Sequence, residues 1–184
     1  MLGSAKVDVK AIVATFGNVG LDQTKKNLLR ILGLFEPPPD SEEAPRIPLI
    51  GSGSRGPLRH KARRARHVHG RDGLADVSDI FGRSHRSAFK NGIDLIINLA
   101  LSNKIDGIIA TGPLTDLARV LKVRPAALEI LKEVVIMGGA VFVKGNVTPY
   151  AEFNFHCDPE ANKIVLDSGV RKKLISLKTD NCSS

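Results

Sequence analysis

The sequence predicts an α/β protein with a mostly parallel sheet that is covered by helices on both faces. Short apolar, β-branched runs alternate with amphipathic segments along most of the 184 residues, which is the pattern of strand–helix–strand units. The apolar runs are continuous rather than alternating, as expected for strands that are buried on both faces. Hydrophobic residues make up 42% of the chain and charged residues 25%, a globular composition that excludes wholesale disorder.

The first half of the chain contains one clear strand and one clear helix. Residues 7–15 form an apolar run that ends in a Gly-Asn turn, so we expect a buried strand. Residues 21–34 place Leu and Ile on one face behind a polar first turn, which predicts an amphipathic helix. Residues 36–48 contain five prolines and four acids and are expected to be an exposed linker. Residues 47–50 are a candidate short strand, and residues 51–85 are expected to form a long loop.

The second half alternates regularly between helix and strand. Pro113 and Pro125 are each expected at the start of a helix. Asp158-Pro159-Glu160 combines an N-cap residue, a proline at the first helical position and an acid in the first turn. The expected elements are a helix at 88–101, a strand at 106–111, helices at 114–121 and 126–131, a strand at 134–137, a helix at 159–167 and a strand at 173–177.

We interpret residues 1–184 as a single partial domain with a basic loop insertion at about 51–86. Residues 46–90 hold eleven Lys or Arg and three acids, and this excess accounts for the whole net charge of +8. A phosphate or nucleic-acid contact built on Arg63-Arg64-Ala-Arg66 is one interpretation. We favour a solvated surface loop without a nucleic-acid partner, because no aromatic stacking residue is interleaved and no nucleic-acid-binding signature surrounds the run.

The sequence gives no sign of membrane insertion or secretion. No run approaches the ~18 consecutive apolar residues that a spanning helix needs, and the N-terminus lacks the basic and apolar regions of a secretory signal. We therefore expect a cytoplasmic protein in which Cys157 and Cys182 are free thiols.

Polar residues and glycines follow three of the predicted strands. The strand ends are Gly17-Asn18, Thr111-Gly112-Pro113 and Met137-Gly138-Gly139. Ligands of parallel α/β sheets bind outside the carboxyl ends of the strands. We therefore expect these three ends to face the same crevice.

Residues 138–156 form the loop with the most polar side chains. Asn146, Glu152 and Asn154 lie within nine positions, and the last two would point to one face of an extended segment. A carboxylate flanked by two carboxamides suits the hydroxyl groups of a sugar. In the alternative interpretation Asn146 supports a turn and Asn154 satisfies the loop backbone.

Six segments together resemble the inosine-uridine-preferring nucleoside hydrolases. They are TFGNV (15–19), HVHGRDGL (67–74), DGIIATGPLTDLA (106–118), MGGA (137–140), GNVTPYAEFN (145–154) and DPEA (158–161). The resemblance runs from about residue 7 to about residue 177. It implies hydrolysis of the N-glycosidic bond of a ribonucleoside to ribose and free base, with a calcium ion in the site. It also implies an α/β fold of the nucleoside hydrolase type, here incomplete.

The resemblance assigns the ribose side of the site to the second half of the chain. The backbone carbonyl of Thr111 matches a calcium ligand. Asn146 and Glu152 match residues that grip the 5′-hydroxyl side of ribose, and Asn154 matches one bonded to a ring hydroxyl.

The remaining matches come from the first half of the chain. Asn18 matches an Asn that faces the ribose and the leaving group. His69 matches a loop His near the base, with His67 as the alternative. No catalytic residue carries over, because the family's DxDxGxDD strand has no counterpart in this sequence. Lys178 stands where an acid is usual.

These departures predict that the chain alone is inactive or nearly so. A calcium site wants six to eight oxygen ligands, and only one carbonyl can be assigned. The alternatives are a catalytically dead protein that binds ribosides or serves as an interaction module, and a basic nucleic-acid-binding module. The resemblance implies dimers or tetramers, and a sheet without its first strand has an exposed edge. Both favour a homo-oligomer.

Overall fold

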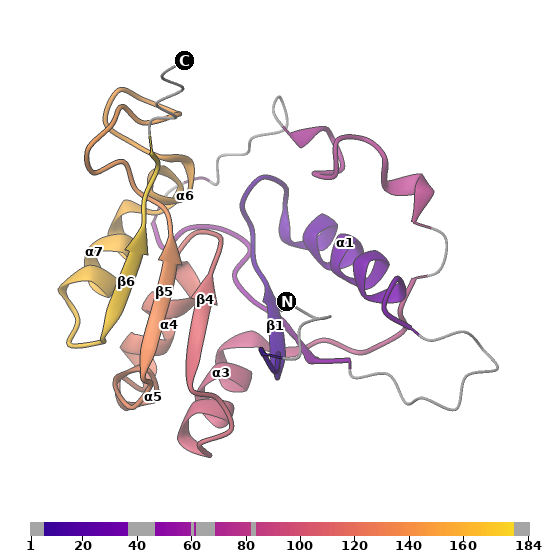
Figure 1. Ribbon diagram of the computed structural model, residues 1–184, viewed down its shortest axis with the longest axis horizontal. Helices are drawn as coiled ribbons and strands as arrows, with labels where there is room; N and C mark the ends of the chain where they lie inside the picture. The colour runs from indigo at the N-terminus through magenta and orange to yellow at the C-terminus, as the bar shows by residue number, and fades with distance from the viewer. Residues whose placement is uncertain (1–5, 37–46, 60, 62–68, 82–83, 179–184) are drawn as a thin grey trace. The chain divides into compact units, whose positions relative to one another are not determined.

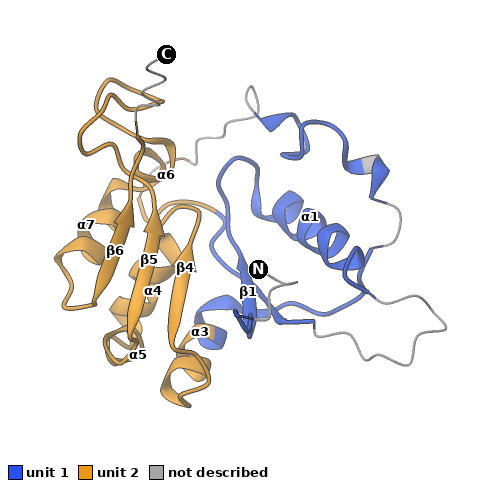
Figure 2. Cartoon of the chain, in the orientation of Figure 1, with its two compact units in different colours: residues 1–55, 63–95 blue, residues 56–62, 96–184 orange. Residues whose placement is uncertain are grey.

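The computed structural model describes residues 6–36, 47–59, 61, 69–81 and 84–178. The chain divides into two compact units (Figure 2). Unit 1 comprises Met1–Arg55 and Arg63–Leu95, and unit 2 comprises Gly56–Ala62 and Ile96–Ser184. Each unit contains its own three-stranded parallel sheet. The α/β class predicted from the sequence is confirmed, with one sheet in each unit.

Unit 1 is built around strands in the order β1-β2-β3. Its elements are β1 (Ala11–Ala14), α1 (Leu21–Gly33), β2 (Leu49–Ser52), the 3-10 helix η1 (Ser78–Ile80), β3 (Lys90–Asn91) and the start of α3 (Gly92–Leu101). Ile12 pairs with Ile50 and Gly51 with Lys90. Its buried apolar side chains include Ala14, Phe16, Val19, Leu21, Leu32 and Ile50.

Two boundaries in unit 1 differ from the sequence prediction for local reasons. The strand expected at 47–50 lies at 49–52, because Pro48 has no N–H to donate to a sheet. The helix expected from residue 88 begins at Gly92, because Asn91 caps it. The Oδ1 atom of Asn91 accepts the backbone N–H groups of Ile93 and Asp94 at 3.0 and 3.2 Å.

Unit 2 contains the second sheet, in the order β4-β5-β6. Its elements are the rest of α3, β4 (Gly107–Ala110), α4 (Thr115–Val123), α5 (Ala126–Glu129), β5 (Glu133–Met137), α6 (Phe153–Cys157), α7 (Pro159–Asp167) and β6 (Lys172–Ile175). In Figure 1, α4 and α5 lie behind this sheet, and α7 packs against α4. Val134 and Ile136 of the central strand are fully buried.

The predicted N-cap at Asp158 is confirmed and has further contacts. The carboxylate is fully buried and accepts the N–H of Ala161 at 3.1 Å. It also accepts the hydroxyl of Thr115 at 2.6 Å and the N–H of Leu58 at 2.9 Å. Arg59 forms an ion pair with Glu160 at 3.0 Å. One carboxylate therefore fastens residues 56–59 to α4 and α7.

The structure also bears on the predictions for the cysteines and for membrane insertion. Cys157 is buried and in no disulfide, whereas Cys182 lies outside the described residues. In the part of the chain that the structure describes, no helix has the length and apolar character that crossing a membrane would require.

Candidate functional site

The carboxyl ends of β4 and β5 are joined by one side chain. The Nδ2 atom of Asn154 donates to the carbonyl oxygen of Thr111 at 3.3 Å and to that of Met137 at 3.2 Å. Thr111 directly follows β4, and Met137 is the last residue of β5. Asn154 is nearly buried, whereas Thr111 and Met137 are exposed. Because Nδ2 of Asn154 donates to both carbonyls, the Oδ1 atom is the part of this side chain that could accept a hydrogen bond from a hydroxyl.

Asn154 lies in a short helix that the sequence analysis missed. Residues 138–156 were expected to be a loop, but α6 begins at Phe153. The expectation that Glu152 and Asn154 share one face of an extended segment is therefore wrong. Glu152 is extended and Asn154 is helical. The sequence does not reveal this helix because its N-cap is Glu152, and Glu is not among the residues that usually cap helices.

Glu152 caps this helix with both oxygens of its carboxylate. Oε1 accepts the N–H of Asn154 at 2.9 Å, and Oε2 accepts the N–H of Phe155 at 3.2 Å. Oε2 also accepts the N–H of Gly139 at 3.0 Å. The Glu152 side chain is thus tied to the helix and to the turn after β5, and the residue is only 4% exposed.

Asn146 satisfies the first helical N–H group. Its Oδ1 atom accepts the N–H of Phe153 at 2.9 Å. Asn146 itself is exposed, and its Nδ2 donors are left for a ligand. In the alternative interpretation Asn146 supports a turn and Asn154 satisfies the loop backbone, and the hydrogen bonds of both side chains to backbone groups agree with a structural role of this kind.

The Gly138-Gly139 turn has no room for side chains. A Cβ atom at Gly138 would lie 2.7 Å from the Phe155 ring and 3.2 Å from Oε2 of Glu152. Gly139 has a φ of +82°, which favours glycine. The sequence predicts this turn at the end of a strand, but it does not mark Phe155 or the Gly139 N–H as groups that surround Glu152.

The other two predicted site residues belong to unit 1. Asn18 is half-buried and follows β1, and His69 is exposed. The loop that follows His69 packs near Asn18, because a Cβ atom at Gly73 would lie 2.8 Å from the Val19 side chain. The Nδ2 atom of Asn27 also donates to the carbonyl of Asp72 at 2.7 Å. Unit 1 thus brings the segments around Asn18 and His69 together, and unit 2 brings together Thr111, Asn146, Glu152 and Asn154.

Asp72 organises the loop after His69. Its carboxylate accepts the N–H groups of Leu74, Asp76 and Ser78 at 2.8, 2.9 and 3.0 Å. These hydrogen bonds, that of Leu74 first, lower the pKa of Asp72 from 3.8 to about 2. The charge of Asp72 therefore has a structural role in this loop.

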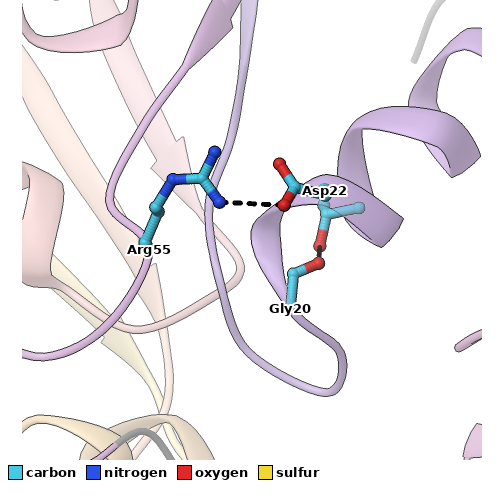
Figure 3. Close-up of polar contacts among 4 residues, drawn as sticks. Gly20, Asp22 and Arg55 are labelled. Atoms are coloured by element: carbon cyan, nitrogen blue, oxygen red, sulfur yellow. Dashed lines mark hydrogen bonds and ion pairs between the residues drawn. The ribbon is translucent and has the colours of Figure 1, made fainter.

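Two arginines of the basic segment are paired with acids. Nη1 of Arg55 lies 2.8 Å from Oδ2 of Asp22 at the start of α1 (Figure 3). This hydrogen bond lowers the pKa of Asp22 and raises that of Arg55. Arg59 pairs with Glu160, as described above. Residues Arg63, Arg64, Arg66 and His67 lie outside the described residues.

The described residues near Thr111 supply too few oxygen ligands to hold a calcium ion by themselves. The Thr111 carbonyl oxygen accepts an amide hydrogen of Asn154, which leaves it one lone pair to offer a cation. Three of the roughly four acceptor positions of the Glu152 carboxylate hold backbone N–H groups. Within the described ranges, no cluster of three or more His, Cys, Asp or Glu could hold a metal ion. Calcium wants six to eight oxygen ligands, mostly carboxylates.

Comparison with known proteins identifies the family. The sequence model of the inosine-uridine preferring nucleoside hydrolases matches residues 1–184. The chain belongs to this family. The family predicted from the sequence motifs is thereby confirmed.

Curated relatives are nearly twice as long as the region that they share with this chain. The pyrimidine-specific ribonucleoside hydrolase RihA of Salmonella schwarzengrund is 37% identical over 170 residues, which are 92% of this chain and 51% of that protein. An uncharacterized protein of Schizosaccharomyces pombe is 33% identical over 171 residues, 92% of this chain and 52% of that protein. The chain spans about half the length of these relatives.

Solved nucleoside hydrolase structures share the fold. A purine-preferring ribonucleoside hydrolase from Gardnerella vaginalis superposes with a TM-score of 0.80 at 28% identity, covering 96% of this chain and 54% of that one. A plant nucleoside hydrolase gives a TM-score of 0.80 at 29% identity, with the same coverage.

Proposed function

We propose that this chain carries the ribose-binding part of a ribonucleoside hydrolase. Family membership gives the reaction class, cleavage of an N-glycosidic bond to ribose and free base. The observation that carries the proposal is the placement of Asn154 across the ends of β4 and β5. Ligands bind at the carboxyl ends of strands in this class of fold.

The polar groups at this end suit a sugar better than a base. Oδ1 of Asn154 can accept a ring hydroxyl, and the Nδ2 donors of Asn146 can reach a ligand oxygen. Asn18 and His69 remain the proposed contacts on the side of the leaving group and the base. The preferred base is not part of the proposal.

Hydrolysis needs more than these residues supply. The attacking water requires a general base and the oxocarbenium-like ribose requires stabilisation, and family resemblance assigns the base and most of the calcium ligands to an aspartate cluster. The described residues hold no such cluster. The mechanism we propose for this chain is therefore limited to binding and orienting the ribose hydroxyls, with the metal site incomplete.

An assay of the purified chain tests whether it binds ribonucleosides without hydrolysing them. Ribose release from inosine or uridine is expected to stay at the uncatalysed rate with or without calcium, while both nucleosides bind saturably. Calcium-dependent turnover at ordinary enzymatic rates, typically about 1 per second or more, would overturn the proposed lack of activity. A chain that binds neither nucleoside would overturn the ribose site.

A second candidate is a riboside-binding protein that works without catalysis. This candidate requires only the polar groups of Asn146 and Asn154 described above as ribose contacts. The nucleic-acid-binding alternative is weakened because Arg55 and Arg59 are paired with acids. RNA binding at low salt that is lost on charge reversal of Arg63, Arg64 and Arg66 would restore it.

We also propose that the chain self-associates through the exposed face of β4-β5-β6. Ile109, Met137 and Ile175 project from this face and are 41–52% exposed. Parallel sheets normally bury both faces. A second copy would remove these side chains from water.

A further inference from the structure

We infer that a second copy of the chain docks on the exposed face of β4-β5-β6 with Glu133 of each copy against Lys173 of the other. This inference rests on the self-association proposed above and names the contacts that orient the two copies. Glu133 begins β5, and Lys173 lies within β6. Among the residues that the structure describes, neither side chain has an ion-pair partner.

The alternation of side chains along the strands places both charges on the exposed face. Successive side chains of a strand point to opposite faces of the sheet. Val134 is fully buried, so Glu133 lies on the opposite face, together with Met137, which is 41% exposed. Lys173 and Ile175 are the exposed positions of β6. Acid, base and apolar side chains therefore share one face of unit 2.

The strand register shows how close the charges lie to the apolar side chains. Met137 pairs with Ile175, and Val135 pairs with Lys173. Glu133 lies two residues before Val135 on the same strand. Both charges are thus on the amino side of the apolar pair formed by Met137 and Ile175. A molecule that covers these apolar side chains also approaches the two charges.

The charges select one orientation of the second copy. Burying an unpaired charge is unfavourable, and like charges that meet across an interface oppose binding. In a two-fold interface, residue i of one copy contacts residue j of the other, and j contacts i. An axis that passes between Glu133 and Lys173 brings opposite charges together twice. An axis that stacks each residue on its own counterpart brings like charges together twice, so the first orientation is favoured.

Reversing one charge at a time tests this orientation. Glu133→Lys gives the face two bases, and Lys173→Glu gives it two acids. In each variant dimer both contacts become repulsive. We expect the dissociation constant of either variant dimer, measured by sedimentation equilibrium, to rise about tenfold or more above that of the wild type. A wild-type dissociation constant for both variants would overturn the inference.

An equimolar mixture of the two variants gives the sharpest result. In a heterodimer of Glu133→Lys with Lys173→Glu, each contact again joins a base to an acid. We therefore expect the mixture to form heterodimers with a dissociation constant close to that of the wild type. Variants that stay monomeric when they are mixed would overturn the inference.

Glu129→Lys and Lys122→Glu are the matched controls. They make the same changes of net charge in the same unit, at exposed sites of α5 and α4. We expect both control variants to associate as the wild type does, alone and mixed. If they weaken alone and complement each other when mixed, net charge rather than contact causes the effect, and the inference is overturned.

The wild-type mass separates this inference from the self-association on which it rests. A wild-type chain that stays a monomer overturns both. A wild-type dimer whose charge variants do not complement each other overturns only the orientation.

Carbodiimide cross-linking of the wild-type dimer keeps the inference testable if a charge variant does not fold. This reagent joins a carboxylate to an amine without a spacer, so only groups in direct contact react. In a mixture of ¹⁴N- and ¹⁵N-labelled chains, we expect cross-linked peptides that combine Glu133 of one isotope with Lys173 of the other. Cross-links confined to a single chain, or no cross-link between these residues, would overturn the inference.

Discussion

Single residues at the ends of strands and in loops determine the local order of both units. Asp72 is one example, because three backbone N–H groups converge on its carboxylate. Glu152 has the same arrangement in unit 2. In each case one anionic side chain satisfies several backbone donors that the loop would otherwise leave without partners.

Asp72 predicts an acid-sensitive loop. Its pKa is lowered from 3.8 to about 2 in the folded chain, so its charged form stabilises the loop above pH 3.8. This contribution is lost as the pH falls through about 2. We expect the amide signals of Leu74, Asp76 and Ser78 to shift together in an NMR titration with a midpoint near 2. Asp72→Asn is the control and should abolish that step, whereas a midpoint near 3.8 in the wild type would contradict the assignment.

The structural role of a single residue was predictable from the sequence where the residue is part of a common local motif. Asp158 followed by Pro159 is a recognisable helix start, and the structure confirms it. Glu152 as an N-cap was not predictable, because long acidic side chains rarely cap helices and no periodicity marks a five-residue helix. The partners of Asn154 are backbone carbonyls, which a sequence pattern does not locate.

At the scale of elements, the turn after β5 is set by side chains that are distant in sequence. Gly138→Ala would place a Cβ atom 2.7 Å from the Phe155 ring. Overpacking of this kind costs about 1–3 kcal/mol, so we expect a clear loss of stability in urea unfolding.

Gly169→Ala is the matched control for Gly138→Ala. Nothing lies within 4 Å of a Cβ atom at Gly169. We expect no loss, and a gain of up to about 1 kcal/mol from the smaller entropy of the unfolded chain. Equal stabilities of the two variants would contradict the close packing of Phe155 on the turn.

The start of α7 gives a second prediction at this scale. Asp158→Ala removes the acceptor for the N–H of Ala161, the hydroxyl of Thr115 and the N–H of Leu58. Loss of a cap costs about 1 kcal/mol, and each buried donor left without a partner costs about 1–3 kcal/mol more.

Glu160→Ala, two residues further along the chain, is the control for Asp158→Ala. It removes a partly exposed ion pair with Arg59, and such pairs contribute about 0–1 kcal/mol. We expect the midpoint of urea unfolding to fall much further for Asp158→Ala. Similar losses for the two variants would show that Asp158 does not fasten residues 56–59.

At the scale of the whole molecule, the exposed sheet face in unit 2 predicts self-association. Ile109 and Ile175 lie on the outer strands of this sheet, on either side of Met137. We expect light scattering to report a mass above the 19.8 kDa of one chain at micromolar concentration. Replacing Ile109 and Ile175 by Lys should return the chain to a monomer, whereas Ile130→Lys, at an exposed site after α5, should not. A single-chain mass at all concentrations would contradict the proposal.

The fold class and the family were predictable at this scale because they depend on distributed signals. Alternating strands and helices and six motifs in order do not require any single boundary to be right. The division into two compact units was not predictable, because the charge excess at residues 46–90 does not coincide with the unit boundaries after residues 55, 62 and 95. The predicted calcium ligand at Thr111 depended on the resemblance, and its surroundings depend on the tertiary contact with Asn154.

The most direct test of the ribose site is a residue-resolved NMR titration of the chain with D-ribose, inosine and free hypoxanthine. We expect ribose and inosine to shift the signals of Thr111, Met137 and the Asn154 side-chain amide saturably, and hypoxanthine to leave them unchanged. Asn154→Ala should abolish these shifts at the first two residues. Saturable shifts that avoid the ends of β4 and β5, or that hypoxanthine alone reproduces there, would contradict the proposed site.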